Sequence, residues 1–324
     1  MRVVITGGAG FLGSHLCDAL VLRGDSVVCV DDLSTGRLAN LRHLRDHPGL
    51  TFVECDVTRG VDVTGPVDAV AHLASPASPP DYLRRPLDTL AVGSRGTEHA
   101  VSLAQRHGAR FLLASTSEIY GSPALHPQPE EYWGNVNPIG PRSVYDESKR
   151  YAEALTAAYA RTHGVNTGIV RIFNTYGPRM RSHDGRVITN FISQALTGRP
   201  LTIYGDGSQT RSFCYVDDLV AGLVAMLDAT EPGPVNLGNP EECTVAELAR
   251  LVQRLTGTDV PIDLRPLPQD DPPRRRPVIE RATRTLGWRP VTGLEEGVRR
   301  TIDWFKARPE ELGERKLSRT SSTT

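Results

Sequence analysis

The stretch Val3–Asp31, VVITGGAGFLGSHLCDALVLRGDSVVCVD, carries the pattern that decides the fold. It begins with a short apolar run typical of a buried parallel strand, passes through a glycine-rich turn into residues at helical spacing, and ends in a second apolar run. Gly8, Gly10 and Gly13 fit the spacing G-x-G-x-x-G, and Gly7 precedes them. Between a strand and a helix, such glycines let the backbone approach a dinucleotide pyrophosphate at the helix N-terminus. The stretch therefore predicts a strand–helix–strand unit that binds a dinucleotide.

The acidic residue at the end of this unit indicates which dinucleotide binds. Asp31 follows the second apolar run, where a carboxylate can accept hydrogen bonds from the adenosine ribose hydroxyls. The same charge repels a 2′-phosphate, so NAD is favoured over NADP. The glycine motif alone would be a weak signal, and its context is what favours a nucleotide site. The predicted cofactor contacts are Gly7, Gly10, Phe11, Leu12, Gly13, Asp31, Asp32, Ser34, Gly36, Asp56, Val57, Leu73 and Ala74, with Tyr145 and Lys149.

Apolar runs and helical segments keep alternating through the first half of the chain. One long helix is expected after Pro86, and another is expected from Ser143, which is a candidate N-cap. Such alternation predicts an α/β fold with a Rossmann-type, doubly wound parallel sheet. Ligands of these sheets bind at the carboxyl ends of the strands. The glycine turn, Asp31, His72–Ser75 and Thr116–Glu118 all fall at such ends.

The alternation loosens beyond about residue 175, which suggests two unequal domains. Residues 1–175 are expected to form the NAD-binding domain, to which a segment near 213–236 returns. Residues 176–310 are expected to form a smaller C-terminal α/β substrate domain. Residues 311–324 are rich in Ser and Thr, and a disordered tail is expected there.

The composition excludes several classes of protein. The chain has 324 residues, of which 39% are hydrophobic and 23% charged, and its formal net charge is 37 − 38 = −1. We therefore expect no nucleic-acid or membrane partner, and we find no sequence pattern of a signal peptide or a membrane span. The five cysteines are odd in number and mostly lie in apolar patterns, so we expect them reduced and buried in a cytoplasmic protein. No cluster has the spacing of a metal site, and none is expected.

Tyr145 and Lys149 form the strongest catalytic signal in the second half of the first domain. Residues four apart on a helix lie on one face, which places the phenol beside the ammonium. A free tyrosine titrates near 10, and lowering its pKa by about 3 units requires about 4 kcal/mol of differential stabilisation. The lysine together with a cationic nicotinamide ring could supply it. For a lone Y-x-x-x-K, an ordinary amphipathic helix would be the better interpretation, and the N-terminal nucleotide motif is what favours catalysis.

With these motifs placed, residues 2–306 resemble the extended short-chain dehydrogenase/reductase family and, within it, the UDP-glucuronic acid decarboxylases, also called UDP-xylose synthases. The resemblance rests on five runs, of which the first and third are the most specific to the decarboxylases. They are Ser75–Tyr82, Ser115–Glu118, Tyr132–Arg142, Arg171–Met180 and Tyr204–Phe213. In the related dTDP-glucose dehydratases an aspartate that protonates the departing hydroxyl stands where this chain has Ser117. A serine cannot serve as that acid, so this position favours decarboxylation over dehydration.

The resemblance implies a substrate and a set of roles. Tyr145 would take the C4 hydroxyl proton of UDP-glucuronic acid while NAD takes the hydride, with Thr116 orienting O4 and Lys149 holding the nicotinamide ribose. The resulting 4-keto acid loses CO₂, and return of the hydride gives UDP-xylose. Glu118 and Arg275 complete the catalytic set; the alternatives are a structural hydrogen-bond acceptor for Glu118 and a solvated charge run for 274–276. The implied substrate contacts are Ser78, Tyr82, Asn174, Arg179, Arg186, Tyr204, Gln209, Arg211 and Arg275.

Two departures and two rival functions remain. Gly93 stands where the family has Asn, Ala91 stands where it has Lys, and Ser148 replaces a common glycine. A UDP-sugar 4-epimerase or dehydratase is the first rival, and Ser117 and the run Ser75–Tyr82 count against it. An NAD-sensing binding protein is the second, and the intact Thr116, Tyr145 and Lys149 disfavour it. The family also implies a homodimer formed through the helices near 86–105 and 143–163.

Overall fold

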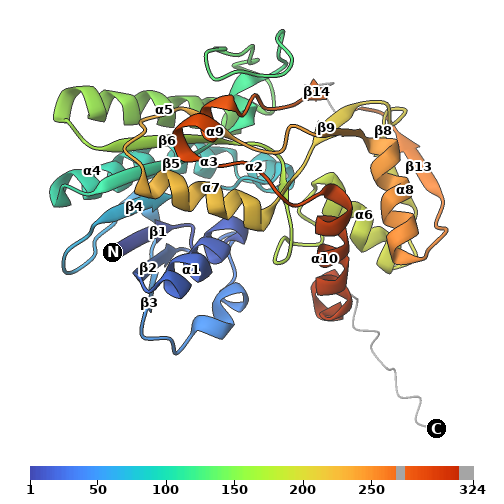
Figure 1. The fold of residues 1–324 in the computed structure, drawn as a ribbon, viewed down its shortest axis with the longest axis horizontal. Helices are drawn as coiled ribbons and strands as arrows, with labels where there is room; N and C mark the ends of the chain where they lie inside the picture. Colours follow the sequence, from blue (N-terminus) through green and yellow to red (C-terminus); the bar gives the residue numbers. More distant parts are fainter. Residues whose placement is uncertain (268–273, 314–324) are drawn as a thin grey trace.

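A sheet of seven parallel strands forms the larger part of the computed structural model, which describes residues 1–267 and 274–313 (Figure 1). The strand order is β3-β2-β1-β4-β5-β6-β11, so the order reverses between β1 and β4. This is the doubly wound Rossmann order, and it confirms the predicted fold class. The strands are β1 (Arg2–Thr6), β2 (Ser26–Asp31), β3 (Leu50–Glu54), β4 (Ala69–His72), β5 (Arg110–Thr116), β6 (Thr167–Ile172) and β11 (Val235–Leu237).

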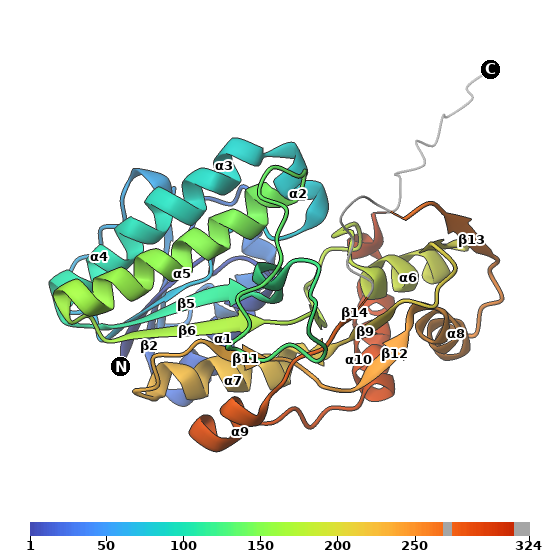
Figure 2. The ribbon, with the colours of Figure 1, turned by 90° about the horizontal axis from the view of Figure 1, so that it is seen from above.

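Helices cover both faces of this sheet, as Figure 2 shows. Successive residues of a strand point to opposite faces, so Val3 and Ile5 pack into one hydrophobic core while Val4 packs into the other. Both faces are apolar because each is covered, which explains the continuous apolar runs of the sequence. One face carries α3 (Pro86–Ala91), α4 (Thr97–His107) and α5 (Ser143–His163), and the other carries α1 (Phe11–Arg23), α7 (Val216–Asp228) and α9 (Glu280–Leu286).

The remaining elements gather beyond the carboxyl ends of the strands, beside the large sheet (Figure 2). Three helices, α6 (Val187–Leu196), α8 (Val245–Thr256) and α10 (Leu294–Lys306), pack there with three small sheets. In one of these sheets Arg275 lies opposite Arg211 in register. Their strands are β7 (Thr175–Tyr176), β8 (Leu201–Tyr204), β9 (Thr210–Ser212), β10 (Cys214–Tyr215), β12 (Glu242–Thr244), β13 (Ile262–Arg265) and β14 (Arg274–Arg275).

The chain crosses between these two parts more than once. After β10 it returns as α7 against the large sheet, and β11 then pairs in parallel with β6. The predicted domain boundary at residue 175 stays a prediction. Glu311, near the C-terminal end of the described residues, accepts a hydrogen bond at 2.5 Å from Arg37, which lies in the loop after β2. The rest of the predicted tail, 314–324, and residues 268–273 lie outside the described residues.

The expected long helix after Pro86 is present, and it contains a π-helical turn at Val92–Gly96, between α3 and α4. Two other local expectations were wrong. Ser143 is the first residue of α5 rather than its N-cap; the N-cap is Arg142, and no side chain caps this end. Three cysteines are buried as expected, but Cys55 and Cys243 are partly exposed. Within residues 1–267 and 274–313, no helix is long and apolar enough to cross a membrane.

Candidate active site

A cavity of about 1110 Å³ opens along the carboxyl ends of the parallel strands. The strands deliver polar groups to this edge because their apolar runs end there, and residues of the small sheets line the far side of the cavity. Every residue that the sequence analysis placed in the site lines this cavity, with the exception of Gly36. The order of strands reverses at this point of the sheet, which is where doubly wound folds bind their ligands.

The glycine turn forms one end of the cavity. The turn runs from β1 into α1, and Gly10 precedes the first helical residue, Phe11. A Cβ atom on Gly13 would lie 2.1 Å from the carbonyl oxygen of Gly7, so only glycine allows this close approach of helix and turn. The N-terminus of α1, with its free N–H groups, therefore faces the cavity, as an anion such as a pyrophosphate requires.

Asp31, the last residue of β2, is buried beside the glycine turn. Its carboxylate accepts hydrogen bonds from the backbone N–H groups of Ala9 at 2.9 Å and Leu33 at 2.8 Å. Burial raises the pKa of this carboxyl group, and the two backbone donors act against that rise. Gly36 lies behind the carboxylate rather than at the cavity wall: a Cβ atom there would lie 2.7 Å from Asp31 Oδ1. Gly36 thus lets the loop fold over Asp31.

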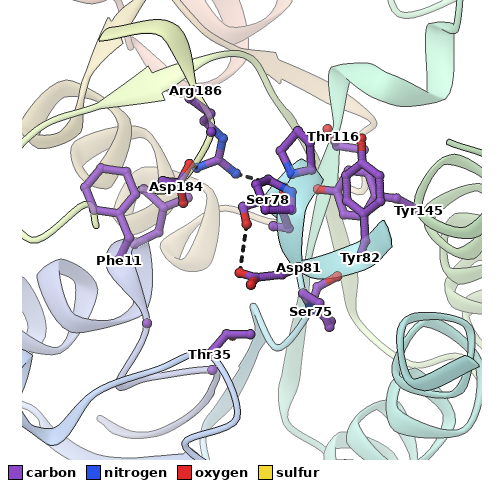
Figure 3. A pocket seen from close by; sticks show the side chains of 18 of the residues that line it. Phe11, Thr35, Ser75, Ser78, Asp81, Tyr82, Thr116, Tyr145, Asp184 and Arg186 are labelled. Carbon is purple, nitrogen blue, oxygen red and sulfur yellow. Dashed lines mark hydrogen bonds and ion pairs between the residues drawn. The ribbon is translucent and has the colours of Figure 1, made fainter. Parts of the chain in front are cut away.

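Tyr145 and Tyr82 stack in the middle of the cavity, and Figure 3 shows the two rings lying over each other. Their centroids are 5.2 Å apart and their planes differ by 7°. Burial raises the pKa of Tyr145 to about 12, and a hydrogen bond with the Thr116 side chain acts in the opposite direction. The expected lowering of the Tyr145 pKa is therefore not a property of the protein alone. The hydroxyl of Tyr82 is buried and has no hydrogen-bond partner in the part of the chain that the structure describes.

Lys149 lies on the same face of α5 as Tyr145, as its spacing predicted. Its ammonium is 5.9 Å from the centre of the Tyr145 ring and donates to the carbonyl oxygen of Ala114 at 2.9 Å. Burial lowers the pKa of Lys149 to about 8, while the charge of Glu153 acts to raise it. An ammonium has three donors, so Lys149 has protons to offer to a ligand in the cavity.

Glu118 is held by two arginines. Arg275 binds both oxygens of the carboxylate, and Arg142 Nη2 donates to Oε2 at 2.7 Å. Burial acts to raise the pKa of Glu118, but the charges of Arg275 and Arg142 hold it well below its usual range. Glu118 is therefore ionised, which suits it to binding and orienting rather than to donating a proton. Arg142 was not among the predicted site residues. Its position three residues before Tyr145 could have indicated that it lies near the site.

Two segments that are distant in the sequence meet at the wall of the cavity. Ser78 Oγ donates to Asp81 at 2.7 Å, and Arg181 binds the same carboxylate from the other segment. Arg186 Nη2 donates to the carbonyl oxygen of Ala77 at 2.9 Å, and Figure 3 shows Arg186 above Ser78. The sequence analysis named Ser78 and Arg186 but missed Asp81 and Arg181, which are separated by 100 positions along the chain.

The other predicted substrate residues line the far side of the cavity. Arg179 Nη2 donates to Asp18 of α1 at 2.5 Å, so this guanidinium also fixes the helix that begins at the glycine turn. Arg211 is buried beside Arg275, and Tyr204 is partly exposed at the end of β8. Gln209 Nε2 donates to the carbonyl oxygen of Tyr204 at 2.6 Å. Asn174 follows β6 and borders the same space.

The fold and this site define a Rossmann-type protein with a dinucleotide end, a Tyr–Lys–Thr centre and an arginine-rich far side. The chain belongs to the NAD dependent epimerase/dehydratase family, whose model matches residues 3–238. It is 52% identical to the UDP-glucuronic acid decarboxylase 1 of Xenopus tropicalis over 94% of this chain and 72% of the relative. It is 50% identical to the UDP-glucuronic acid decarboxylase 4 of Arabidopsis thaliana over 100% of this chain and 73% of the relative.

Solved structures share the fold over nearly the whole chain. A UDP-glucuronic acid 4-epimerase of Bacillus cereus, in complex with UDP-glucuronic acid and NAD, is 26% identical with a TM-score of 0.82. The match covers 95% of this chain and 99% of that one. A UDP-glucose 4-epimerase of Thermotoga maritima with UDP-glucose is 28% identical with a TM-score of 0.86, over 95% and 99% of the two chains.

Proposed function

We propose that this protein converts UDP-glucuronic acid to UDP-xylose by NAD-dependent decarboxylation through a 4-keto intermediate. The observation that carries the proposal is that the chain is 50–52% identical, over 94–100% of its length, to UDP-glucuronic acid decarboxylases. The site supports the proposal, because the three groups needed to oxidise a sugar hydroxyl line one cavity: Tyr145, Lys149 and Thr116. Ser117, next to Thr116, offers no acid for dehydration.

NAD fits the residues present. The close-packed glycine turn leaves the N-terminus of α1 open to a pyrophosphate, and Asp31 lies buried where the adenosine ribose would bind. When bound, NAD supplies the acceptor for the C4 hydride and later returns it. We assign the pyrophosphate to the glycine turn, the ribose hydroxyls to Asp31, and the nicotinamide ribose to the free donors of Lys149.

The chain's own residues handle the protons and the carboxylate. Tyr145 takes the proton from the C4 hydroxyl, and Thr116, which hydrogen-bonds Tyr145, aligns that oxygen. Once C4 is a ketone, the C5–CO₂ bond breaks and its electron pair moves onto the ketone oxygen as an enolate. Water supplies the proton that is then added at C5, and Tyr145 gives its proton back to the C4 oxygen when the hydride returns. Glu118 remains ionised beside Arg275 throughout, so it orders the ring or a water molecule instead of acting as an acid.

We propose the far side of the cavity as the UDP site. Arg211, Arg179 and Arg186 offer positive charge to the diphosphate, and Asn174 offers an amide. Tyr204 and Gln209, at the outer end, would border the uracil, and Ser78 and Tyr82 would contact the sugar. Among the described residues, the Nε of the buried Arg275 has no hydrogen-bond partner, so Arg275 retains a donor for the substrate.

A cytoplasmic homodimer is the proposed working form. Apolar side chains are exposed on the helices that were predicted to associate: Leu87 is 77% exposed on α3 and Tyr151 is 51% exposed on α5. Pairing of these helices with those of a second copy would cover them. Sedimentation of the purified protein measures this, and a monomer at micromolar concentration would contradict it.

The decisive experiment is to incubate the protein with UDP-glucuronic acid and NAD and to follow the nucleotide sugars by mass spectrometry. Formation of a UDP-pentose without accumulation of NADH supports the proposal. The solved epimerase that binds UDP-glucuronic acid makes 4-epimerisation the second candidate, and this reaction keeps the substrate mass. Chromatographic separation of the two epimers detects it. No turnover of UDP-glucuronic acid by NAD-loaded protein would contradict both reactions.

A further inference from the structure

Two polar groups of α5 bind consecutive residues at the end of β5. Lys149 Nζ donates to the carbonyl oxygen of Ala114 at 2.9 Å, and Glu153 Oε1 accepts from the Ser115 hydroxyl at 2.6 Å. The next residue along the strand is Thr116, which hydrogen-bonds Tyr145. Lys149 and Glu153 are one helical turn apart and thus lie on the same face of α5. The strand end that carries Thr116 is therefore fastened to the catalytic helix at two successive positions.

Glu153 is fixed on its other side by Arg171 of β6. Arg171 Nε donates to Oε1 at 3.0 Å and Nη2 donates to Oε2 at 2.8 Å, so the ion pair is bidentate. Arg171 in turn donates to the Tyr120 hydroxyl at 3.0 Å and the Glu130 carbonyl at 2.8 Å. Glu153 does not line the cavity, so it is outside the reach of a bound ligand.

The charges near Lys149 are few. Burial lowers its pKa, and Glu153 is the charge that opposes this effect. From β4, His72 faces the lysine, but burial lowers the pKa of His72 to about 3, so the ring is neutral. Tyr145 is protonated near neutral pH because its own pKa is raised. From β6, the positive charge of Arg171 lies next to the Glu153 carboxylate, with which it forms an ion pair.

We propose that Glu153 is a positioning residue that keeps Lys149 protonated and holds the end of β5 against α5. An opposite charge nearby favours the charged form of a buried ammonium. Without Glu153, Lys149 would lose its proton at lower pH and with it the attraction that stabilises a tyrosinate at Tyr145. Only the activity test of this role rests on the proposed function. The titration of Lys149 needs no substrate and is therefore independent of it.

The direct test is to titrate Lys149 in the protein and in Glu153→Gln. The chain has three lysines, Lys149, Lys306 and Lys316, so ¹⁵N labelling at the lysine side chain gives three signals. Lys306→Arg and Lys316→Arg assign two of them, and the third is Lys149. We expect the midpoint of Lys149 to fall by about 1 pH unit or more in Glu153→Gln. The matched control is Glu147→Gln, on the same helix, whose exposed pair with Arg150 leaves the Lys149 midpoint unchanged.

Activity provides the second reading. In Glu153→Gln, kcat should begin to fall at a lower pH than in the unchanged protein. This shift should equal the shift of the Lys149 midpoint measured by NMR. Glu153→Asp, which keeps the charge, should reverse most of this shift. If Glu153→Gln does not fold because Arg171 is left unpaired, Glu153→Gln with Arg171→Met is titrated instead and compared with Arg171→Met alone, so that the two proteins differ only in the Glu153 charge. An unchanged Lys149 midpoint in a folded variant overturns the proposal, whether or not UDP-glucuronic acid is a substrate.

Discussion

Burial acts in opposite directions on the two titrating groups of the site. It raises the pKa of Tyr145 to about 12 and lowers that of Lys149 to about 8, because each group is driven toward its neutral form. The protein alone therefore does not make Tyr145 a base at neutral pH. The positive nicotinamide ring of bound NAD would favour the tyrosinate, which couples activation of the base to loading of the cofactor.

Replacement of this phenol gives the first prediction. Tyr145→Phe keeps the ring that stacks on Tyr82 and removes only the hydroxyl. We expect kcat to fall by about 10²–10⁴-fold, the usual contribution of a positioned acid or base, with little change in thermal stability. Steady-state turnover of UDP-glucuronic acid and thermal denaturation check the two parts. A variant that keeps most of its activity would remove Tyr145 from the proposed mechanism.

Asp146 gives a prediction about stability. Its Oδ1 atom is buried and has no hydrogen-bond partner within residues 1–267 and 274–313. Burial together with the charge of Glu118 raises its pKa. The ionised form therefore costs stability above the folded pKa, whereas below the unfolded value near 4 both states are protonated and the cost vanishes. We expect Asp146→Asn to raise the unfolding temperature at pH 8 and to change it little at pH 4. An equal effect at both values would contradict the burial of this charge.

At the scale of elements, the π-helical turn at Val92–Gly96 lies against α5. Thr97 donates its hydroxyl proton to the Gly93 carbonyl at 2.9 Å, so the His72 ring donates from Nε2 to Thr97. His72 Nδ1 then accepts from the Thr6 hydroxyl at 2.7 Å. These bonds fix the turn to β1 and β4 and direct Val92 toward the cavity. Turns of this kind often occur at functional sites.

The contact between this turn and α5 explains two departures of the sequence together. A Cβ atom on Gly93 would lie 2.5 Å from the Ser148 Cβ atom, so a side chain at 93 and a serine at 148 exclude each other. We expect Gly93→Ala to cost about 1–3 kcal/mol of unfolding free energy, and Ser148→Gly to relieve most of that cost. A double-mutant cycle by chemical denaturation measures the coupling. Additive effects would mean that the two positions do not compete for this space.

The sequence predicted the elements that local patterns determine. Residues 3–31 gave the βαβ unit, and the spacing of Tyr145 and Lys149 gave their common face. It could not locate the π turn, because that depends on how closely Gly93 approaches another helix. It also missed the ion pairs of Glu118 and Asp81, because their partners come from distant segments brought together only by the fold. The roles of the cavity residues stay predictions.

At the scale of the whole molecule, residues 177–186, between β7 and α6, contact two separate segments beside the large sheet. The Pro178 carbonyl contacts His15 at 2.9 Å, Arg179 binds Asp18, and Arg181 binds Asp81. The segment therefore reaches both α1, which begins at the glycine turn, and the stretch from Ser78 to Tyr82. Two walls of one cavity are held together by these contacts, so a ligand that touches both walls depends on them.

The pair between Arg181 and Asp81 gives the last prediction. Asp81 is 5% exposed, and although burial acts to raise its pKa, the bond with Arg181 helps to hold the pKa below its usual value. We expect Arg181→Met to weaken UDP binding by about 10-fold or more, since a hydrogen bond to a charged group contributes roughly 1.5–3 kcal/mol. NAD binding should change little, because the glycine turn and Asp31 lie at the other end of the cavity.

Arg84→Met is the matched control for that variant. Arg84 also donates to Asp81, at 2.9 Å, but it is on the same short helix, α2 (Pro79–Arg84), and its side chain is 70% exposed. Its removal leaves the two walls joined, so UDP affinity measured by calorimetry should stay within about 2-fold, as for other exposed ion pairs. Asp81→Asn should reproduce the loss of Arg181→Met, and the double variant should lose no more. Losses that add would instead mean that Arg181 contacts UDP directly and that the pair does not hold the walls together.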